Sequence, residues 1–231
     1  MTSSGFSQVG RKTVELFYDV VSPYSWIGFE LLCRYRHKWN IDLKFKPFFL
    51  GAIMHYSKNS PPGSNLHKGN YAGKDLHRLR SYCNIPLNAP SDVAEVMFVK
   101  GTLSAQRLLT AISMDLDDKA VEDVSRELWL RIWSKDKDIT EADSLLAAAT
   151  NAGIPMEKAK ILLTRIKDQD VKDKLKERTE TALSHGAFGA PTILVHVDGK
   201  AHMYFGSDRM PLIAHLLGEK YEGPLPELSK L

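Results

Sequence analysis

The sequence predicts an α/β fold in which a β-α-β unit and a later β-β-α unit build one mixed sheet, interrupted by a large all-helical insert. Two observations lead to this prediction. Short runs of strand-forming residues occur near both ends of the chain, and helical patterns fill most of the residues between them. The chain has 231 residues, of which 43% are hydrophobic, so it is long enough to bury a substantial core.

The first unit begins with a run of β-forming residues at 14–18, which predicts a strand. Ser22 followed by Pro23 matches an N-cap and a proline at the first helical position, so a helix is expected from there to about Trp39. Residues 41–45 alternate apolar and polar side chains and predict a second strand. Because a helix connects the two strands, they are expected to be parallel.

The second unit lies near the C-terminus. Residues 192–197 and 201–205 predict two strands, and the Asp198-Gly199 pair between them is a strong hairpin signal, so these strands are expected to be antiparallel. Asp208 is expected to cap a last helix that Gly218 closes. The order β-α-β, helices, β-β-α is that of a thioredoxin-like core split by a helical domain.

The insert is expected to begin with a loop-rich stretch, residues 51–73, and then to become helical, with Thr140 capping its fourth helix. The expected helices cover residues 74–83, 91–116, 120–134, 141–151, 157–168 and 170–185. The predicted segments are a flexible N-terminal arm (1–12), a discontinuous thioredoxin-like domain (13–50 and 187–221), the helical insert domain (51–186) and a free C-terminal tail (222–231).

The charge balance and the cysteine count exclude several classes of protein. The net charge is only +3, from 31 basic and 28 acidic residues, which is too balanced for a protein whose main partner is nucleic acid. Cys33 and Cys83 form neither a CxxC motif nor a zinc-type spacing, which argues against a dithiol redox centre and a metal site. No apolar run approaches the ~18 residues of a membrane span.

The two ends of the chain carry possible targeting signals. The last three residues, Ser229, Lys230 and Leu231, match the address that the peroxisomal import receptor reads. Residues 1–12 are Ser-rich, carry Arg11 and Lys12 and lack acidic residues, so a mitochondrial presequence is a second possibility beside a plain flexible start. We therefore expect a peroxisomal protein, with mitochondrial residence as an open addition.

Ser22 stands where redox-active thioredoxin-like proteins place the first cysteine of their CxxC motif. A serine cannot exchange disulfides, but its hydroxyl can donate a hydrogen bond to the thiolate of another molecule. Ionising a thiol of pKa about 8.5 at neutral pH requires about 2.7 kcal/mol. A hydrogen bond to a charged group contributes roughly 1.5–3 kcal/mol and a helix start about 0.5–1 kcal/mol, so the two suffice together. A plain N-cap is the alternative reading of Ser22.

Two other places complete the candidate site. Pro191 enters a strand after Ala190, which matches the cis-proline of thioredoxin-like folds, where the preceding residue offers its backbone to an extended peptide. An ordinary trans-proline at a strand start is the alternative. Ser207 and Asp208 precede the last helix and are able to accept hydrogen bonds from an ammonium group, while backbone N–H groups there suit a carboxylate.

At these residues the chain resembles the kappa class of glutathione transferases, in the DsbA-like superfamily that also holds 2-hydroxychromene-2-carboxylate isomerases. The resemblance rests on residues 14–26, 125–129, 186–189 and 196–210, in the right order, and covers about 13–223. It implies a DsbA-like fold, a homodimer, glutathione as co-substrate, and neither a metal nor another cofactor.

Carried over by position, the resemblance implies that Ser22 is catalytic and orients the glutathione thiolate. Tyr24 is the second candidate for the activating hydroxyl. The implied glutathione-binding residues are Ser22, Pro23, Tyr24, Asn59, Ala190, Ser207 and Asp208, with Lys68 as a weaker candidate for the glycyl carboxylate. Ala190 departs from the family, in which leucine is usual. Cys33 and Cys83 are expected to be inert buried thiols, and His185, near Pro191, is the one histidine of interest.

The function expected from this reading is conjugation of the glutathione thiolate to electrophiles such as aryl halides, with reduction of organic peroxides as an additional activity. A glutathione-dependent isomerase of the 2-hydroxychromene-2-carboxylate type is the first alternative, because the core motifs barely separate it from a transferase. The second alternative is a non-enzymatic thioredoxin-like binding module, which need not bind glutathione. No nucleic-acid partner and no membrane insertion are expected.

Overall fold

The computed structural model describes residues 10–227 and contains a four-stranded mixed sheet in the order β2-β1-β3-β4. β1 (Lys12–Tyr18) pairs in parallel with β2 (Ile41–Pro47). β3 (Thr192–Val197) runs antiparallel to β1 and to β4 (Lys200–Phe205). The predicted α/β fold with a thioredoxin-like core is therefore confirmed, including the parallel and antiparallel pairings.

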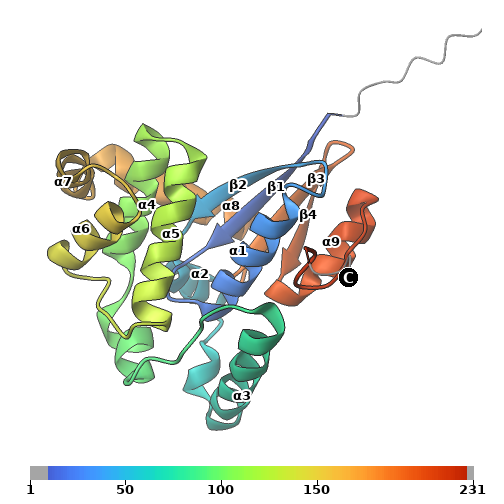
Figure 1. The fold of residues 1–231 in the computed structure, drawn as a ribbon, viewed down its shortest axis with the longest axis horizontal. Helices are drawn as coiled ribbons and strands as arrows, with labels where there is room; N and C mark the ends of the chain where they lie inside the picture. Colours follow the sequence, from blue (N-terminus) through green and yellow to red (C-terminus); the bar gives the residue numbers. More distant parts are fainter. Residues whose placement is uncertain (1–9, 228–231) are drawn as a thin grey trace, which may run out of the picture.

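Helices cover both faces of this sheet (Figure 1). α1 (Pro23–Tyr35) and α9 (Met210–Leu217) lie in front of it in this view, and α8 (Gln169–Ser184) lies behind it. β2 alternates buried and half-buried residues along its length, as a strand with one fully covered face should. The loops that follow the carboxyl ends of β1 and β2 lead into α1 and α2, and they contribute to the candidate site.

The insert consists of α8 and the remaining helices, and most of these remaining helices gather on one side of the sheet (Figure 1). Their buried residues join those of β1 and α1 in one apolar cluster that includes Trp26, Leu108 and Trp129. The predicted boundaries between the two domains stay a prediction. Besides α8, the elements of the insert are α2 (Leu50–Ser57), η1 (Pro62–Ser64), α3 (Leu66–Cys83), the π-helical turn η2 (Glu95–Lys100), α4 (Leu103–Asp115), α5 (Asp118–Trp133), α6 (Ala142–Asn151) and α7 (Met156–Arg165).

Several predicted boundaries are wrong. Residues 51–73 are mainly helical rather than loop-rich, because the proline and glycine signals at 61–63 separate two helices instead of marking one long loop. The single helix predicted at 91–116 is divided by Gly101, whose φ of +68° no helix accommodates. α1 ends at Tyr35, before Trp39, and α9 begins at Met210, after a 3₁₀ turn that replaces the expected cap at Asp208.

Both ends of the described chain are held more firmly than the sequence predicts. β1 begins at Lys12, inside the predicted arm, and residues 1–9 lie outside the described residues. The guanidinium of Arg34 donates to the carbonyl of Pro224 (2.8 Å), and the hydroxyl of Tyr35 donates to that of Gly223 (2.7 Å). The prediction of a free tail is therefore wrong at residues 222–226, which pack on α1. The terminal tripeptide, 229–231, lies outside the described residues.

Candidate active site

Ser22 caps α1, as predicted. Its Oγ accepts a hydrogen bond from the N–H of Ser25 (3.1 Å), which satisfies one of the free donors at the helix start. The same hydroxyl donates to the carbonyl of Ala190 across a long 3.4 Å contact. The carbonyl of Ser22 accepts from the indole of the fully buried Trp129 in α5 (3.3 Å), so the insert supports this residue from below.

The hydroxyl of Tyr24 is hydrogen-bonded to a residue of another helix. It donates to Asp75 Oδ2 in α3 (3.0 Å), and burial together with this hydrogen bond raises the pKa of Tyr24. A phenol that is bonded to a carboxylate is a poor second donor for a thiolate, because its one proton is already committed. Ser22 is the better-placed hydroxyl, and Tyr24 instead ties the start of α1 to α3.

The peptide bond between Ala190 and Pro191 is cis, as predicted. Thr192 Oγ1 donates to the carbonyl of Gly189 (2.9 Å), and the N–H of Gly206 donates to that of Pro191 (3.1 Å). Ala190 is half-buried and lies against the Ser22 hydroxyl. The cis-proline loop therefore faces the start of α1, which is where a peptide substrate would pair with its backbone.

Asn59, in the segment after α2, is hydrogen-bonded to the cis-proline loop. Its Nδ2 donates to the carbonyl of Phe188 (2.7 Å), and its Oδ1 accepts from the N–H of Ser60 (2.8 Å). Both groups of the amide are thus engaged within the protein, although the residue is exposed. The structure places Asn59 as a tie between the segment after α2 and the cis-proline loop.

Gly28 brings α1 close to the other two parts of the site, a role that the sequence reading missed. A Cβ on Gly28 would lie 3.2 Å from Pro191 Cγ and 3.7 Å from Ser207 Cα. Ser207 is buried at the start of η3 (Ser207–Arg209), whereas Asp208 is exposed and pairs with Arg209 (3.1 Å). The glycine inside α1 is the signal that would have predicted this close approach.

The remaining predicted residues lie further out. Lys68 is exposed in the first turn of α3, and His185 ends α8, where its ring contacts the carbonyl of Thr181 (2.9 Å). Cys33 and Cys83 are buried free thiols, and burial raises the pKa of each. Cys33 is three helical turns from Ser22, about 16 Å along α1, so it does not take the place of the missing cysteine.

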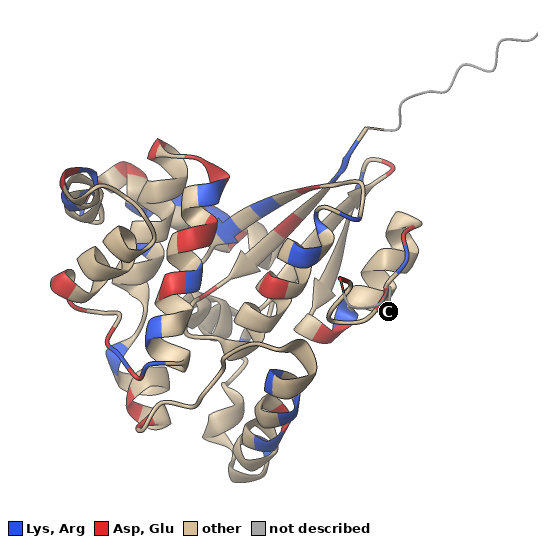
Figure 2. Ribbon diagram, viewed as in Figure 1, with Lys and Arg blue, Asp and Glu red and all other residues tan. Residues whose placement is uncertain are grey.

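The charges around the site are mainly positive on α3 (Figure 2). This helix, to which Tyr24 is bonded, carries several exposed cations and one acidic residue, Asp75. A field of this sign favours the approach of an anionic substrate. The cationic side chains of α3 are Lys68, Lys74, Arg78 and Arg80.

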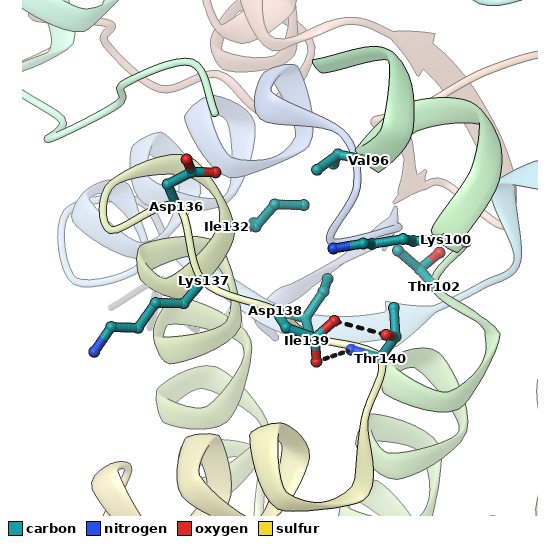
Figure 3. A pocket seen from close by; sticks show the side chains of 10 residues that line it. Val96, Lys100, Thr102, Ile132, Asp136, Lys137, Asp138, Ile139 and Thr140 are labelled. Carbon is teal, nitrogen blue, oxygen red and sulfur yellow. Dashed lines mark hydrogen bonds between the residues drawn. The ribbon is translucent and has the colours of Figure 1, made fainter. Parts of the chain in front are cut away.

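A separate small cavity lies within the insert, between η2 and the segment after α5 (Figure 3). Its volume of about 50 Å³ is too small for a peptide and suits a few water molecules. On its wall, the Asp138 carboxylate accepts from the hydroxyl (2.6 Å) and the N–H (2.9 Å) of Thr140. Thr140 is thus bound by Asp138 rather than capping α6, whose N-cap is Glu141.

Residues 10–227 lack two further features. No cluster of three or more His, Cys, Asp or Glu side chains there is arranged to hold a metal ion. None of the helices in that range is long and apolar enough to cross a membrane.

Comparison with known proteins gives consistent results. A family model described as a DSBA-like thioredoxin domain matches residues 13–218. Glutathione S-transferase kappa 1 of Homo sapiens is 54% identical over 93% of this chain and 95% of its own length, and glutathione S-transferase kappa 2 of Caenorhabditis elegans is 34% identical over 94% and 96%. A 2-hydroxychromene-2-carboxylate isomerase structure superposes with a TM-score of 0.70 at 18% identity, covering 89% of this chain and 94% of that one.

The isomerase likeness shows the fold alone, because the identity is low. The likeness to the transferases is of another kind, since it extends over nearly the whole of both chains at up to 54% identity. The resemblance drawn from the sequence motifs is confirmed. The chain belongs to the kappa class of glutathione transferases, within the DsbA-like thioredoxin-domain family, and is a transferase enzyme.

Proposed function

We propose that this chain binds glutathione between the start of α1 and the cis-proline loop and holds its cysteinyl sulfur as a thiolate beside Ser22. The thiolate then attacks an electrophile such as an aryl halide. A sulfur–carbon bond forms, and the halide leaves as the anion. Organic peroxides are a second class of electrophile, in which the thiolate attacks one peroxide oxygen and the alkoxide leaves.

The observation that carries this proposal is the position of the Ser22 hydroxyl. Its oxygen already accepts from the N–H of Ser25, which polarises the O–H bond and makes it a stronger donor. Its proton makes only one long hydrogen bond, 3.4 Å to the carbonyl of Ala190. Little is therefore lost when the hydroxyl turns to another acceptor. A thiolate arriving at the helix start therefore gains a donor at low cost.

The remaining parts of glutathione are assigned to the protein groups that surround the Ser22 hydroxyl. The backbone of Ala190, held beside the cis-proline, suits the cysteinyl residue, and Pro23 and Tyr24 form the adjoining wall. Ser207 and Asp208 suit the γ-glutamyl end, whose ammonium group would compete with Arg209 for the exposed Asp208 carboxylate. Asn59 supports the cis-proline loop, and the glycyl carboxylate lies toward the basic helix α3, with Lys68 as its nearest proposed partner.

Assembly and location complete the proposal. The chain is proposed to form a homodimer, as the resemblance of its sequence motifs to the kappa class implies. The terminal tripeptide 229–231 supports recognition by the peroxisomal import receptor, and the Ser-rich, basic start supports mitochondrial residence in addition. Detoxification of electrophiles is the role that fits these properties together.

The test uses isotopically labelled glutathione and 1-chloro-2,4-dinitrobenzene with the purified full-length chain. Saturable formation of labelled conjugate supports the transferase. Turnover of a 2-hydroxychromene-2-carboxylate without net loss of glutathione would instead establish the isomerase. A protein that shows no thermal shift with millimolar glutathione and no turnover would be a binding module, and the proposal would be refuted.

A further inference from the structure

Three buried polar side chains beneath the Ser22 loop have no part in the proposed chemistry. Asp19 and Gln106 are 0% exposed, and Thr102 is 4% exposed. Asp19 lies in the loop between β1 and α1, whereas Thr102 and Gln106 belong to the start of α4 in the insert. We call Asp19, Thr102 and Gln106 the buried clamp. Polar groups at such depth are costly unless hydrogen-bonded, so their partners explain their presence.

Gln106 holds the carboxyl ends of two neighbouring strands. Its Nε2 donates to the carbonyl of Tyr18 at the end of β1 (2.8 Å) and to that of Phe48, just beyond β2 (2.6 Å). Its Oε1 accepts from the N–H of Val20 (3.4 Å). One side chain of the insert thus binds three backbone groups of the sheet edge that carries the site.

Asp19 binds the loop itself and the start of the next helix. Its Oδ1 accepts from the N–H of Val21 (3.1 Å), and its Oδ2 accepts from that of Leu50, the first residue of α2 (3.0 Å). The Thr102 hydroxyl lowers the pKa of this carboxyl group, against the larger effect of burial. Asp19 therefore connects α1, α2 and α4 at one point.

These contacts decide which donors face a ligand at the start of α1. The N–H groups of Val20 and Val21 are taken by the clamp, and that of Ser22 is taken by the carbonyl of Asp19 (3.0 Å). The next residue is a proline, which has no N–H. The N–H of Ser25 is taken by the Ser22 hydroxyl. The donors left for an anion are that hydroxyl and the N–H of Tyr24, which has no acceptor within the helix.

We propose that Asp19, Thr102 and Gln106 are positioning residues for the glutathione thiolate, because this clamp turns the amides of Val20 and Val21 inward and holds the Ser22 hydroxyl on the ligand side. This inference rests on the proposed function, in which Ser22 stabilises that thiolate. Because Thr102 and Gln106 lie at the start of α4, this positioning role gives the insert control over the geometry of the thiolate site in the thioredoxin-like core.

The test compares two matched substitutions in α4. Thr102→Val removes the hydroxyl that acts on the Asp19 carboxyl group and keeps the shape of the side chain. Thr110→Val is the control, because Thr110 is also fully buried but its hydroxyl donates to the carbonyl of Gln106 within the same helix (2.7 Å). The readouts are the pH midpoint of thiolate formation by bound glutathione, from its ultraviolet difference absorbance, together with kcat, KM and Tm.

Thr102→Val is expected to raise the midpoint and to lower kcat about three- to tenfold at neutral pH, with little change in the KM for glutathione. Thr102→Ser, which keeps the hydroxyl, should restore both. Thr110→Val should lower Tm and leave the midpoint unchanged. A purely structural role would instead lower Tm in both valine variants without moving the midpoint in either.

The outcomes separate this inference from the function on which it rests. A thiolate signal that is present in the parent, lost in Ser22→Ala and unchanged in Thr102→Val refutes the clamp alone. A parent whose bound glutathione gives no thiolate signal refutes the clamp and the proposed function together. If Thr102→Val does not fold, Asp19→Asn is measured instead. Asp19→Asn keeps the shape of the side chain but only one acceptor oxygen. An unchanged pH midpoint of thiolate formation in that variant overturns the proposal.

Discussion

Replacing Ser22 by alanine separates its observed role as a helix cap from its proposed role as a thiolate donor. The hydroxyl caps α1 through the N–H of Ser25 (3.1 Å), and in the proposed function it also donates to the glutathione thiolate. Loss of a hydrogen bond to a charged group costs about 1.5–3 kcal/mol. Since one pKa unit corresponds to about 1.4 kcal/mol, the pKa of the bound thiol should rise by roughly 1–2 units. Below that pKa the thiolate fraction, and with it kcat, should fall about ten- to a hundredfold.

The cap contributes separately to stability. Its loss should reduce the free energy of unfolding by about 1 kcal/mol and lower Tm by roughly 2–4 °C. Asp117→Ala is the matched control, because Asp117 caps α5 by accepting from the N–H of Ala120 (2.9 Å), outside the candidate site. We expect a similar loss of Tm in this control and an unchanged kcat.

The assay is conjugation of glutathione to 1-chloro-2,4-dinitrobenzene across a range of pH, beside the difference absorbance of the bound thiolate. Retention of the parental pH profile in Ser22→Ala would refute the reasoning and leave the backbone N–H of Tyr24 as the main donor. A fall in kcat equal in Ser22→Ala and Asp117→Ala would show that lost stability, rather than a lost donor, explains the effect.

Three further predictions follow from the same geometry. Tyr24→Phe should leave the pH profile of conjugation unmoved while lowering the free energy of unfolding by about 1 kcal/mol, because its hydroxyl serves Asp75; a shifted profile would reinstate it as a thiolate donor. Gly28→Ala should lower the free energy of unfolding by about 1–3 kcal/mol and weaken glutathione binding, since the new Cβ would lie 3.2 Å from the cis-proline. The control is Gly73→Ala in α3, where a Cβ would have no atom within 4 Å. In urea unfolding this control should be more stable than the parent by up to ~1 kcal/mol. Burial raises the pKa of Asp19 to about 6, against the hydrogen bonds that it accepts. The native state therefore binds more protons than the unfolded chain between about pH 4 and 6. The stability of the parent relative to Asp19→Asn should thus fall by about 2 kcal/mol from pH 4 to 7, and a flat difference in urea unfolding would contradict this.

The parts of the fold that sequence reasoning predicted are those with local causes. The cap at Ser22, the hairpin at Asp198-Gly199 and the strand before it each depend on neighbouring residues, and each is present. The errors arise where local signals conflict. The segment 91–116 has a helical pattern throughout, yet Gly101 with its positive φ divides it. At residues 222–226 the prolines prevent a helix, as expected, but contacts with distant residues of α1 hold the chain in place.

The buried clamp had no local signal. Gln106 reads as one polar residue in an amphipathic helix, and Asp19 reads as a residue of a turn before a helix cap. Their partners are 88 and 31 residues away along the chain, at Tyr18 and Leu50. Contacts of this range depend on how the insert packs against the sheet, which periodicity and capping rules do not determine.

A serine at the start of α1 and a cis-proline opposite it are consistent with one physical logic. In a dithiol enzyme the helix start and the cis-proline serve a thiolate of the protein itself and the peptide that it attacks. Here the sequence Ser22-Pro23-Tyr24-Ser25 occupies that helix start, so the Ser22 hydroxyl and the N–H of Tyr24 remain for a sulfur that, in the proposed function, arrives with a ligand. A ligand thiolate cannot be held by a covalent bond to the loop. The loop must therefore be held rigid by the protein, and this is what Asp19 and Gln106 do through five backbone hydrogen bonds. On this argument, the polar contacts beneath the loop serve a sulfur that, in the proposed function, is bound as part of a ligand rather than carried by the protein.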